Sequence, residues 1–259
     1  MTEPRPKTWK VLVLGNSVAT MVVPPRTSRD DMTYGEALES LLRSHGWDAE
    51  VRNAGRWYEL LAGGVRRFME EERTLFPDVV IIQYGINECQ PAVMPMWLIR
   101  HFVTWDRGQG ALARWYRDAV APHFWVRLRN YQRRMSAIVG LSTWRMRAGR
   151  FARELTRLVQ WMREDKCLVL VLDVNRPGSR LTYFMPGLEA RWEVYQRVLA
   201  ETVAQLDDSE VRLVPVSKVV EEFGEEAGLP DGLHYTAAAH RRVAELLADE
   251  IESWITAEG

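Results

Sequence analysis

Val11-Leu-Val-Leu-Gly-Asn-Ser17 is the stretch that decides the fold. Four apolar residues, two of them β-branched, predict a buried strand, and Gly15-Asn16 predicts a sharp turn directly after it. Ser17 then lies at the carboxyl end of the strand, which is the edge where open α/β sheets bind their ligands. Taken alone, a serine in this position is more often a turn residue or a helix N-cap than a reactive group.

Segments with the pattern of strands alternate with helical segments along the rest of the chain. The expected strands are 10–14, 48–52, 78–84, 167–172 and 211–216, and the expected helices are 33–45, 57–72, 150–164, 188–206 and 235–255. Such alternation favours a parallel sheet with helices on both faces. The sequence therefore predicts an α/β protein, a three-layer α/β/α sandwich around a five-stranded parallel sheet in the flavodoxin-like order.

Length and composition favour a single domain over residues 1–259, with 47% hydrophobic residues and a net charge of -1. This charge gives no reason to expect a nucleic acid as partner. Cys89 and Cys167 lie far apart, in or next to apolar runs, which predicts reduced thiols in the core. Neither a signal-peptide pattern nor a run of 18 apolar residues is present, so we expect no stable membrane insertion and a cytoplasmic location.

Residues 95–149 do not fit the alternation and predict a helical insertion, because about 80 residues separate the third expected strand from the fourth. From Trp97 to Arg150 the chain has eleven arginines, no lysine and two acidic residues, a net charge of +9. Its five tryptophans are Trp97, Trp105, Trp115, Trp125 and Trp144. The insertion could be a cap whose arginine stems cover its own apolar face. Alternatively, it could bind an anionic substrate or carrier, because the guanidinium group suits phosphate and carboxylate.

Residues suited to acyl transfer follow the first three strands and precede the last helix. Ser17, Gly55 and Asn87 are in the loops after those strands, and Asp231-Gly-Leu-His234 precedes the helix. We expect them to converge at one edge of the sheet. A serine hydroxyl becomes a nucleophile when a base takes its proton, and His234 could be that base, oriented by Asp231. The N–H groups of Ser17 and Gly55 and the Asn87 side chain could bind the oxyanion.

Four short blocks carry a family resemblance. Gly15-Asn-Ser17, Asn53-Ala-Gly55, Gly85-Ile-Asn87 and Asp231-Gly-Leu-His234 resemble, in this order, the four blocks of the SGNH (GDSL-like) hydrolases. The resemblance spans nearly the whole chain and implies a flavodoxin-like α/β/α sandwich. It also implies that the serine is the nucleophile, that the glycine and asparagine complete the oxyanion hole, and that the Asp-x-x-His pair completes the triad. The family requires no metal or organic cofactor.

The chain departs from the family pattern at three places. Asn16 stands where the first block usually has aspartate, and the loss of charge could change how the loop is anchored. Glu88 stands where the third block usually has aspartate, which keeps the charge and adds a methylene group. The arginine-rich insertion is not a core feature of the family, and we expect it to set the choice of substrate or partner.

The sequence favours a serine hydrolase, esterase- or lipase-like, that cleaves a carboxylic ester of a small or medium molecule through an acyl-enzyme. An acyltransferase with the same triad, which moves the acyl group to an alcohol or amine, is the alternative. A non-catalytic binding module on this scaffold is a third hypothesis, but it would not need Ser17, Asp231 and His234 together.

Other polar residues have weaker interpretations. Arg176 and Arg180 follow the fourth expected strand and could contact an anionic group of the substrate. His240 is expected to be a solvated residue of the last helix. His101 and His123 could line the cleft, and no His, Cys and carboxylate cluster has the spacing of metal ligands.

Overall fold

Five parallel strands form one sheet in the computed structural model, which describes residues 7–24, 26–95, 98 and 110–258. The strands are β1 (Trp9–Gly15), β2 (Ala49–Asn53), β3 (Val79–Gln83), β4 (Leu168–Leu172) and β5 (Val211–Val214). Their order is β2-β1-β3-β4-β5, and every neighbouring pair is parallel. This is the flavodoxin-like order, so the predicted fold class is confirmed.

Burial differs between the central strands and the edge strands. Every residue of β3 and β4 is buried, and so are the last five residues of β1. In the edge strand β2 only Ala49 is buried, and in the edge strand β5 the two middle residues are half-buried or exposed. A strand that is covered on both faces needs a continuous apolar run, which is the pattern that predicted the three central strands from the sequence.

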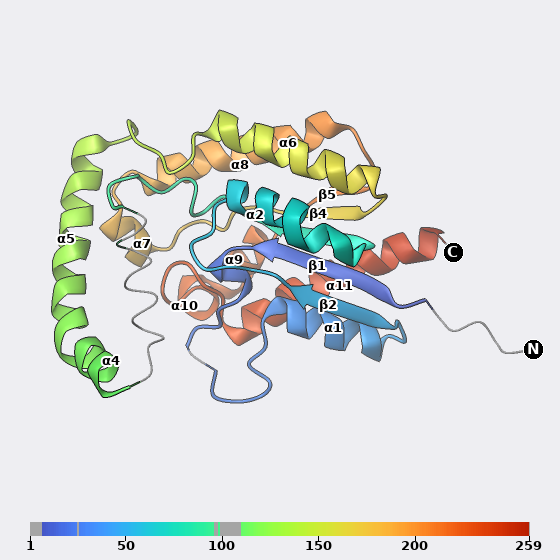
Figure 1. Cartoon of the computed structure of the whole chain (residues 1–259), viewed down its shortest axis with the longest axis horizontal. Coiled ribbons are helices and arrows are strands. Elements are labelled where there is room, and N and C mark those ends of the chain that lie inside the picture. The colour runs from blue at the N-terminus through green and yellow to red at the C-terminus, as the bar shows by residue number, and fades with distance from the viewer. Residues whose placement is uncertain (1–6, 25, 96–97, 99–109, 259) are drawn as a thin grey trace, which may run out of the picture.

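Helices cover both faces of the sheet (Figure 1). α1 (Tyr34–Ser44) and α11 (Ala237–Glu258) cover one face, while α2 (Leu61–Arg67), α6 (Ala148–Glu164) and α8 (Leu188–Leu206) cover the other. The other helical elements among the described residues are η1 (Ser17–Ala19), η2 (Phe68–Glu72), η3 (Arg73–Leu75), α4 (Ala111–Trp115), η4 (Tyr116–Val120), α5 (Ala121–Val139), α7 (Ser179–Phe184), α9 (Ser217–Phe223) and α10 (Glu225–Gly228). Helix α8 has the bounds that the sequence predicted.

The helix expected over 57–72 is shorter than predicted. It begins at Leu61, and its last part, Phe68–Glu72, is a π-helical turn. Tyr58 has a left-handed backbone with φ 54°, so a regular right-handed helix cannot include this residue and begins after it. The segment before α2 is therefore a turn, and it brings Tyr58 to the edge of the sheet where the strands end.

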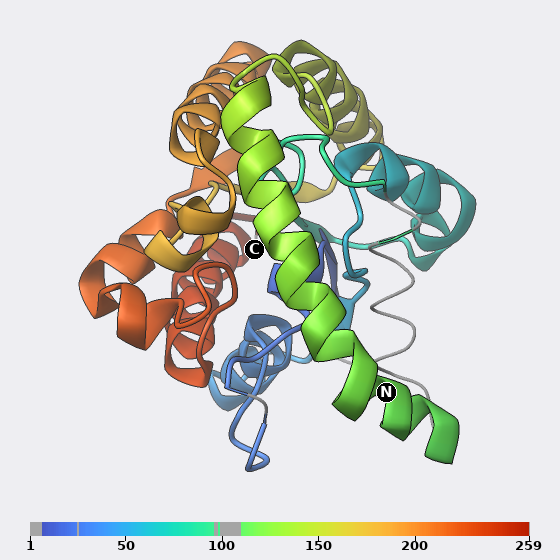
Figure 2. The same ribbon diagram turned by 90° about the vertical axis from the view of Figure 1, so that its left-hand side faces the viewer.

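Within residues 95–149, the described part is dominated by α5, a helix of 19 residues. It runs across the carboxyl ends of the strands, as Figure 2 shows in the view onto that edge. The buried Arg191 of α8 donates hydrogen bonds to the carbonyl groups of Gly140 and Thr143, just after the end of α5. Arg133 of α5 donates to the Tyr183 hydroxyl of α7 at 2.8 Å. These contacts hold α5 beside α7 and α8. Trp97, Trp105 and His101 lie outside the described residues.

Both cysteines are buried and not bonded to each other, as predicted. Burial raises the pKa of the Cys167 thiol to about 12, and it also raises the pKa of Cys89. Both side chains therefore stay protonated and act as small apolar groups of the core.

His240 is fully buried, so the prediction of a solvated helix residue was wrong. Its Nε2 contacts the Met21 carbonyl oxygen at 2.8 Å, and its Nδ1 accepts from the Tyr34 backbone N–H at 3.1 Å. A neutral ring with its hydrogen on Nε2 satisfies both contacts. His240 therefore ties the loop after Ser17 to the start of α1, which no local pattern in the sequence indicates.

Burial lowers the pKa of His240 from 6.5 to about 4. Because this ring binds its proton more readily in the unfolded chain, it contributes stability above pH 6.5 that is lost as the pH falls towards 4. At about 1.4 kcal/mol per pKa unit, the loss is about 3 kcal/mol. The free energy of unfolding, measured by urea titration, should decrease in wild type as the pH falls from 7 to 4. In His240→Gln we expect this decrease to be smaller by up to about 3 kcal/mol. A His123→Gln control removes an exposed histidine instead. The same slope in wild type and His240→Gln would contradict the assignment.

Candidate active site

Ser17 lies in the turn that joins β1 to the 3₁₀ helix η1. Asn16 caps this helix, because its Oδ1 accepts from the Val18 N–H at 3.0 Å. A neutral amide oxygen therefore anchors the loop in the position where the family usually has aspartate. The backbone N–H of Ser17 has no hydrogen-bond partner among the described residues, and the side chain is 5% exposed. The turn thus holds the Ser17 hydroxyl and its own N–H at the carboxyl end of the sheet.

Ser17, His234 and Asp231 form one hydrogen-bonded series. The Ser17 Oγ lies 2.9 Å from His234 Nε2, and His234 Nδ1 lies 2.7 Å from Asp231 Oδ2. A carboxylate can only accept, so Nδ1 carries the ring hydrogen and Nε2 faces the hydroxyl as an acceptor. The structure therefore brings together, with this geometry, the three residues that the sequence singled out.

The Asp231 carboxylate is held by its own turn. Its other oxygen, Oδ1, accepts from the backbone N–H groups of Leu233 at 2.9 Å and His234 at 2.8 Å. Burial favours a raised pKa for Asp231, but the hydrogen bond from the His234 ring and the two backbone donors outweigh it. The net pKa of Asp231 lies below its usual range, so this group remains a carboxylate at neutral pH.

Gly55 lies against the serine turn. A Cβ at this position would be 2.6 Å from Thr20 Cγ2 and 3.1 Å from the Asn16 carbonyl oxygen, so only glycine allows this approach. Its N–H donates to Asn53 Oδ1 at 3.1 Å, and Asn53 Nδ2 donates to the Ala19 carbonyl oxygen at 2.7 Å. The predicted oxyanion donor is thus already engaged, and Asn53 fastens β2 to the serine turn.

Asn87 is buried in the loop after β3. Its Nδ2 donates to the Glu59 carbonyl oxygen at 3.3 Å, and its Oδ1 accepts from Gln90 Nε2 at 3.3 Å. The second amide hydrogen has no partner in the described part of the chain. The side chain is therefore oriented by its neighbours and retains one donor.

Glu88 has a larger role than its sequence position indicated. The buried carboxylate accepts from the Leu61 N–H at the start of α2 (2.6 Å) and from the Gly85 N–H (2.8 Å). Burial raises the pKa of Glu88 to about 7, while these hydrogen bonds oppose the rise. The glutamate thereby fixes the loop that presents Asn87. In the sequence, this role was indicated by an acidic residue directly after the Gly85-Ile-Asn87 block.

A pocket of about 230 Å³ lies beside His234 and below α5. Tyr58, Arg129, Arg145, Arg180 and Asp231 supply most of its polar lining. The other lining residues besides His234 are Gln90, Met94, Trp125, Gln132, Leu181, Met185 and Leu233. Of the two arginines predicted from the loop after β4, Arg180 lines this pocket, whereas Arg176 pairs with Glu189 and does not. His123 is exposed on α5 and does not line it either.

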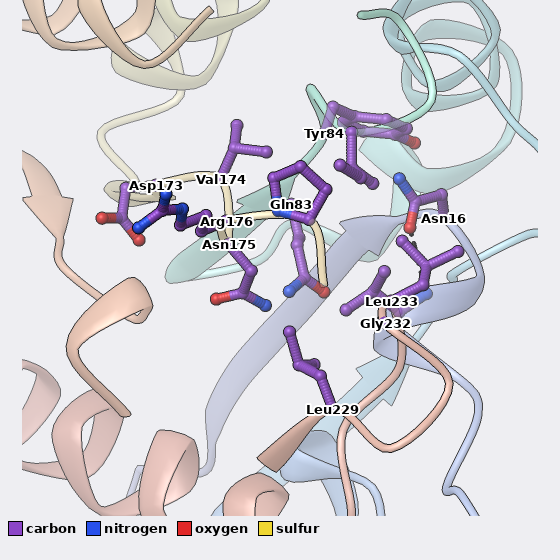
Figure 3. A pocket seen from close by; sticks show the side chains of 13 residues that line it. Asn16, Gln83, Tyr84, Asp173, Val174, Asn175, Arg176, Leu229, Gly232 and Leu233 are labelled. Atoms are coloured by element: carbon purple, nitrogen blue, oxygen red, sulfur yellow. Dashed lines mark hydrogen bonds between the residues drawn. The ribbon is translucent and has the colours of Figure 1, made fainter. Parts of the chain in front are cut away.

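Figure 3 shows a second hollow, of about 20 Å³, next to the serine turn. Asn16 and Asn175 line it from the loops after β1 and β4, Gln83 lines it from the end of β3, and Leu229 lies below them in this view. This volume suits about one water molecule and excludes an ester substrate. Of these two spaces beside the triad, the pocket next to His234 is the larger.

Comparison with solved structures identifies the fold, whereas a scan of protein-family models and a search of curated proteins each found no match. A lipase/acylhydrolase from Enterococcus faecalis is 15% identical, with a TM-score of 0.63 over 95% of this chain and 96% of that chain. TesA is 20% identical, with a TM-score of 0.57 over 92% and 95%. A putative GDSL-like lipase from Parabacteroides merdae is 13% identical, with a TM-score of 0.57 over 93% and 94%. This chain has the SGNH hydrolase fold.

The SGNH fold accounts for the placement of the four sequence blocks at one edge of the sheet. Within the described residues, no group of three or more His, Cys, Asp and Glu side chains is arranged to hold a metal ion. None of the helices over the same residues combines the length and apolarity that a membrane span requires.

Proposed function

We propose that this chain is an SGNH-type serine hydrolase that cleaves a carboxylic ester through an acyl-enzyme on Ser17. The observation that carries the proposal is the unbroken series from Asp231 through His234 to Ser17, with a pocket beside it. Each of the three groups has the partner that its role requires. The likeness to a solved lipase/acylhydrolase and to a putative GDSL-like lipase supports the same reaction class at the level of the fold.

The reaction follows from these contacts. Ser17 Oγ attacks the ester carbonyl carbon while His234 Nε2 takes the hydroxyl proton, and Asp231 stabilises the imidazolium that forms. The tetrahedral intermediate collapses by breaking the bond to the alcohol oxygen, which receives the proton from His234. Water, activated by the same imidazole, then attacks the acyl-enzyme and releases the acid, with Ser17 recovering its proton.

Two N–H groups without a hydrogen-bond partner among the described residues support an oxyanion hole at this site. The Ser17 N–H and the second amide hydrogen of Asn87 have no partner among the described residues, so both can bind the oxyanion. The N–H of Gly55 is proposed as the third donor, and it would have to exchange or share its 3.1 Å hydrogen bond to Asn53 when the intermediate forms. This arrangement stabilises charge that exists only after the attack, which raises kcat rather than substrate affinity.

Labelling with a fluorophosphonate tests the proposal directly. The probe should form one adduct, and peptide mapping should place it on Ser17, because only an activated serine attacks phosphorus readily. A panel of p-nitrophenyl esters of increasing acyl length then measures hydrolysis. Absence of labelling together with absence of ester hydrolysis would contradict the proposed function.

The acyltransferase alternative shares the first half of this reaction. It differs in whether water or another nucleophile resolves the acyl-enzyme, so product analysis separates the two. With p-nitrophenyl butyrate and added alcohols, a hydrolase should release mainly butyrate. Preferential formation of the transfer ester at low alcohol concentration would favour the acyltransferase.

Asn87→Ala is expected to lower kcat by about 10²-fold with a much smaller change in KM, because it removes one oxyanion donor. Steady-state kinetics on p-nitrophenyl acetate measures this. Asn130→Ala, an exposed position on α5, is the matched control and should retain wild-type kinetics. An effect on KM alone would refute the oxyanion role of Asn87.

A further inference from the structure

The pocket beside His234 carries an excess of positive charge. Arg129 comes from α5, Arg145 from the segment after α5, and Arg180 from α7. Asp231 is the one carboxylate among the lining residues, and its two oxygens are already used by His234 and Leu233. Three guanidinium groups thus share one cavity in which the described carboxylate is already engaged by the triad.

Arg129 and Arg180 differ from the arginines of this chain that pair with a carboxylate. Elsewhere, arginines such as Arg73, Arg163 and Arg212 lie within 2.9 Å of a carboxylate. Among the described residues, the guanidinium groups of Arg129 and Arg180 take part in no ion pair or hydrogen bond. A partner for these two cations is therefore missing from the part of the chain that the structure describes.

Aromatic rings hold Arg129 in place. Its guanidinium lies 5.0 Å from the ring centre of Trp125 and 4.7 Å from that of Phe184. Stacking of this kind orients the planar group and leaves its N–H donors at the edges. Burial lowers the pKa of Arg129, and the like charge of Arg180 lowers it further. Tyr58 and Asp231 oppose this shift, and the net pKa of Arg129 lies below its usual value.

Arg145 is fixed by its backbone. Its N–H donates to the Gln90 carbonyl oxygen at 3.0 Å, which ties it to the loop that contains Asn87. Burial lowers the pKa of Arg145, while Tyr58 and Glu88 oppose the shift. Arg145 therefore lines the pocket next to the loop after β3, which contributes Gln90 and Met94 to the same lining.

We propose that Arg129, Arg145 and Arg180 bind an acidic group, a carboxylate or phosphate, of the ester substrate. This inference rests on the proposed function, because the acid group would be held in the same pocket as the reacting ester. The forked guanidinium geometry suits both anions. Met94, Met185 and Leu233 line the same pocket and suit the apolar part of the molecule. The substrate class is thus an ester that also carries an acid group.

Matched pairs of esters test the inference and show where the acid group belongs. On the acyl side, mono-p-nitrophenyl glutarate is compared with p-nitrophenyl valerate. On the alcohol side, 4-acetoxybenzoate and 4-acetoxyphenyl phosphate are compared with methyl 4-acetoxybenzoate. At least one acid-bearing ester should have a kcat/KM about tenfold or more above its neutral partner, mainly through KM. The preference should shrink as salt is added.

The double substitution Arg129→Gln and Arg180→Gln should lower the ratio of kcat/KM for the acid-bearing ester to kcat/KM for its neutral partner by about tenfold or more. It does so because it deletes charge-assisted hydrogen bonds. Arg134→Gln, an exposed arginine on the same helix, is the control and should keep the preference. A preference for acid-bearing esters that survives the double substitution would overturn the assignment of these arginines. Equal or lower kcat/KM for every acid-bearing ester in wild type would overturn the inference itself.

A binding measurement separates this inference from the proposed function. In a Ser17→Ala background, calorimetric titration with each intact ester reads affinity without turnover. Tighter binding of an acid-bearing ester, lost in the double arginine variant, supports the acid-group site even if hydrolysis fails. Hydrolysis of neutral esters with no such difference in binding would overturn the acid-group site and leave the hydrolase proposal standing.

Discussion

Ser17→Ala is expected to lower kcat/KM for p-nitrophenyl acetate by about 10⁴-fold or more. The substitution removes the oxygen that attacks the ester and leaves His234 Nε2 without the proton that it would accept. Steady-state kinetics with active-site titration measures the loss, and fluorophosphonate labelling should disappear with it.

The fold of Ser17→Ala should be unchanged. The hydrogen bond to His234 is the contact that its hydroxyl makes in the described structure, so alanine leaves the turn and its backbone bonds in place. Ser44→Ala, which removes an exposed hydroxyl from the end of α1, is the matched control. Residual activity of Ser17→Ala within tenfold of wild type would exclude Ser17 as the nucleophile.

Asp231→Asn should cost about 10⁴-fold in kcat, nearly as much as loss of the nucleophile. The amide that replaces Oδ2 presents N–H donors to His234 Nδ1, which favours the tautomer with its hydrogen on Nε2. That nitrogen then donates towards Ser17 Oγ and can no longer accept its proton. Comparison of kcat for wild type and variant on p-nitrophenyl acetate measures the effect.

The turn around position 231 should persist in Asp231→Asn. The amide oxygen that the substitution leaves in place of Oδ1 can still accept from the backbone N–H groups of Leu233 and His234. Asp249→Asn changes an exposed carboxylate on α11 and serves as the control for the loss of charge. A loss of less than about tenfold in Asp231→Asn would contradict the orienting role, since the wrong tautomer cannot act as base.

Local patterns in the sequence determined the main strands, most of the longer helices and the four blocks at the sheet edge. Apolar runs such as Val79–Gln83 form strands wherever helices cover both faces, and helical periodicity defined α8. The blocks around Ser17 and Asp231 are turns that are stabilised by hydrogen bonds between residues close in the sequence. Asn16 accepts from the Val18 N–H, and Asp231 accepts from the His234 N–H. These features depend on interactions over a few residues, which a sequence displays directly.

Features that depend on distant residues required the tertiary structure. His240 is buried because α11 packs it against the loop after Ser17 and the start of α1, which are more than two hundred residues earlier. The N–H of Gly55 is engaged because Asn53 folds back from the end of β2.

Only the tertiary structure decided which of many arginines reach the pocket. Arg129, Arg145 and Arg180 converge there because α5 crosses the carboxyl ends of the strands and packs beside α7. Arg176, only four residues from Arg180, pairs with Glu189 instead. The sequence determined the chemical type and number of these side chains. Their convergence is set by how the insertion packs on the sandwich, and packing between distant elements leaves no periodic trace in the chain.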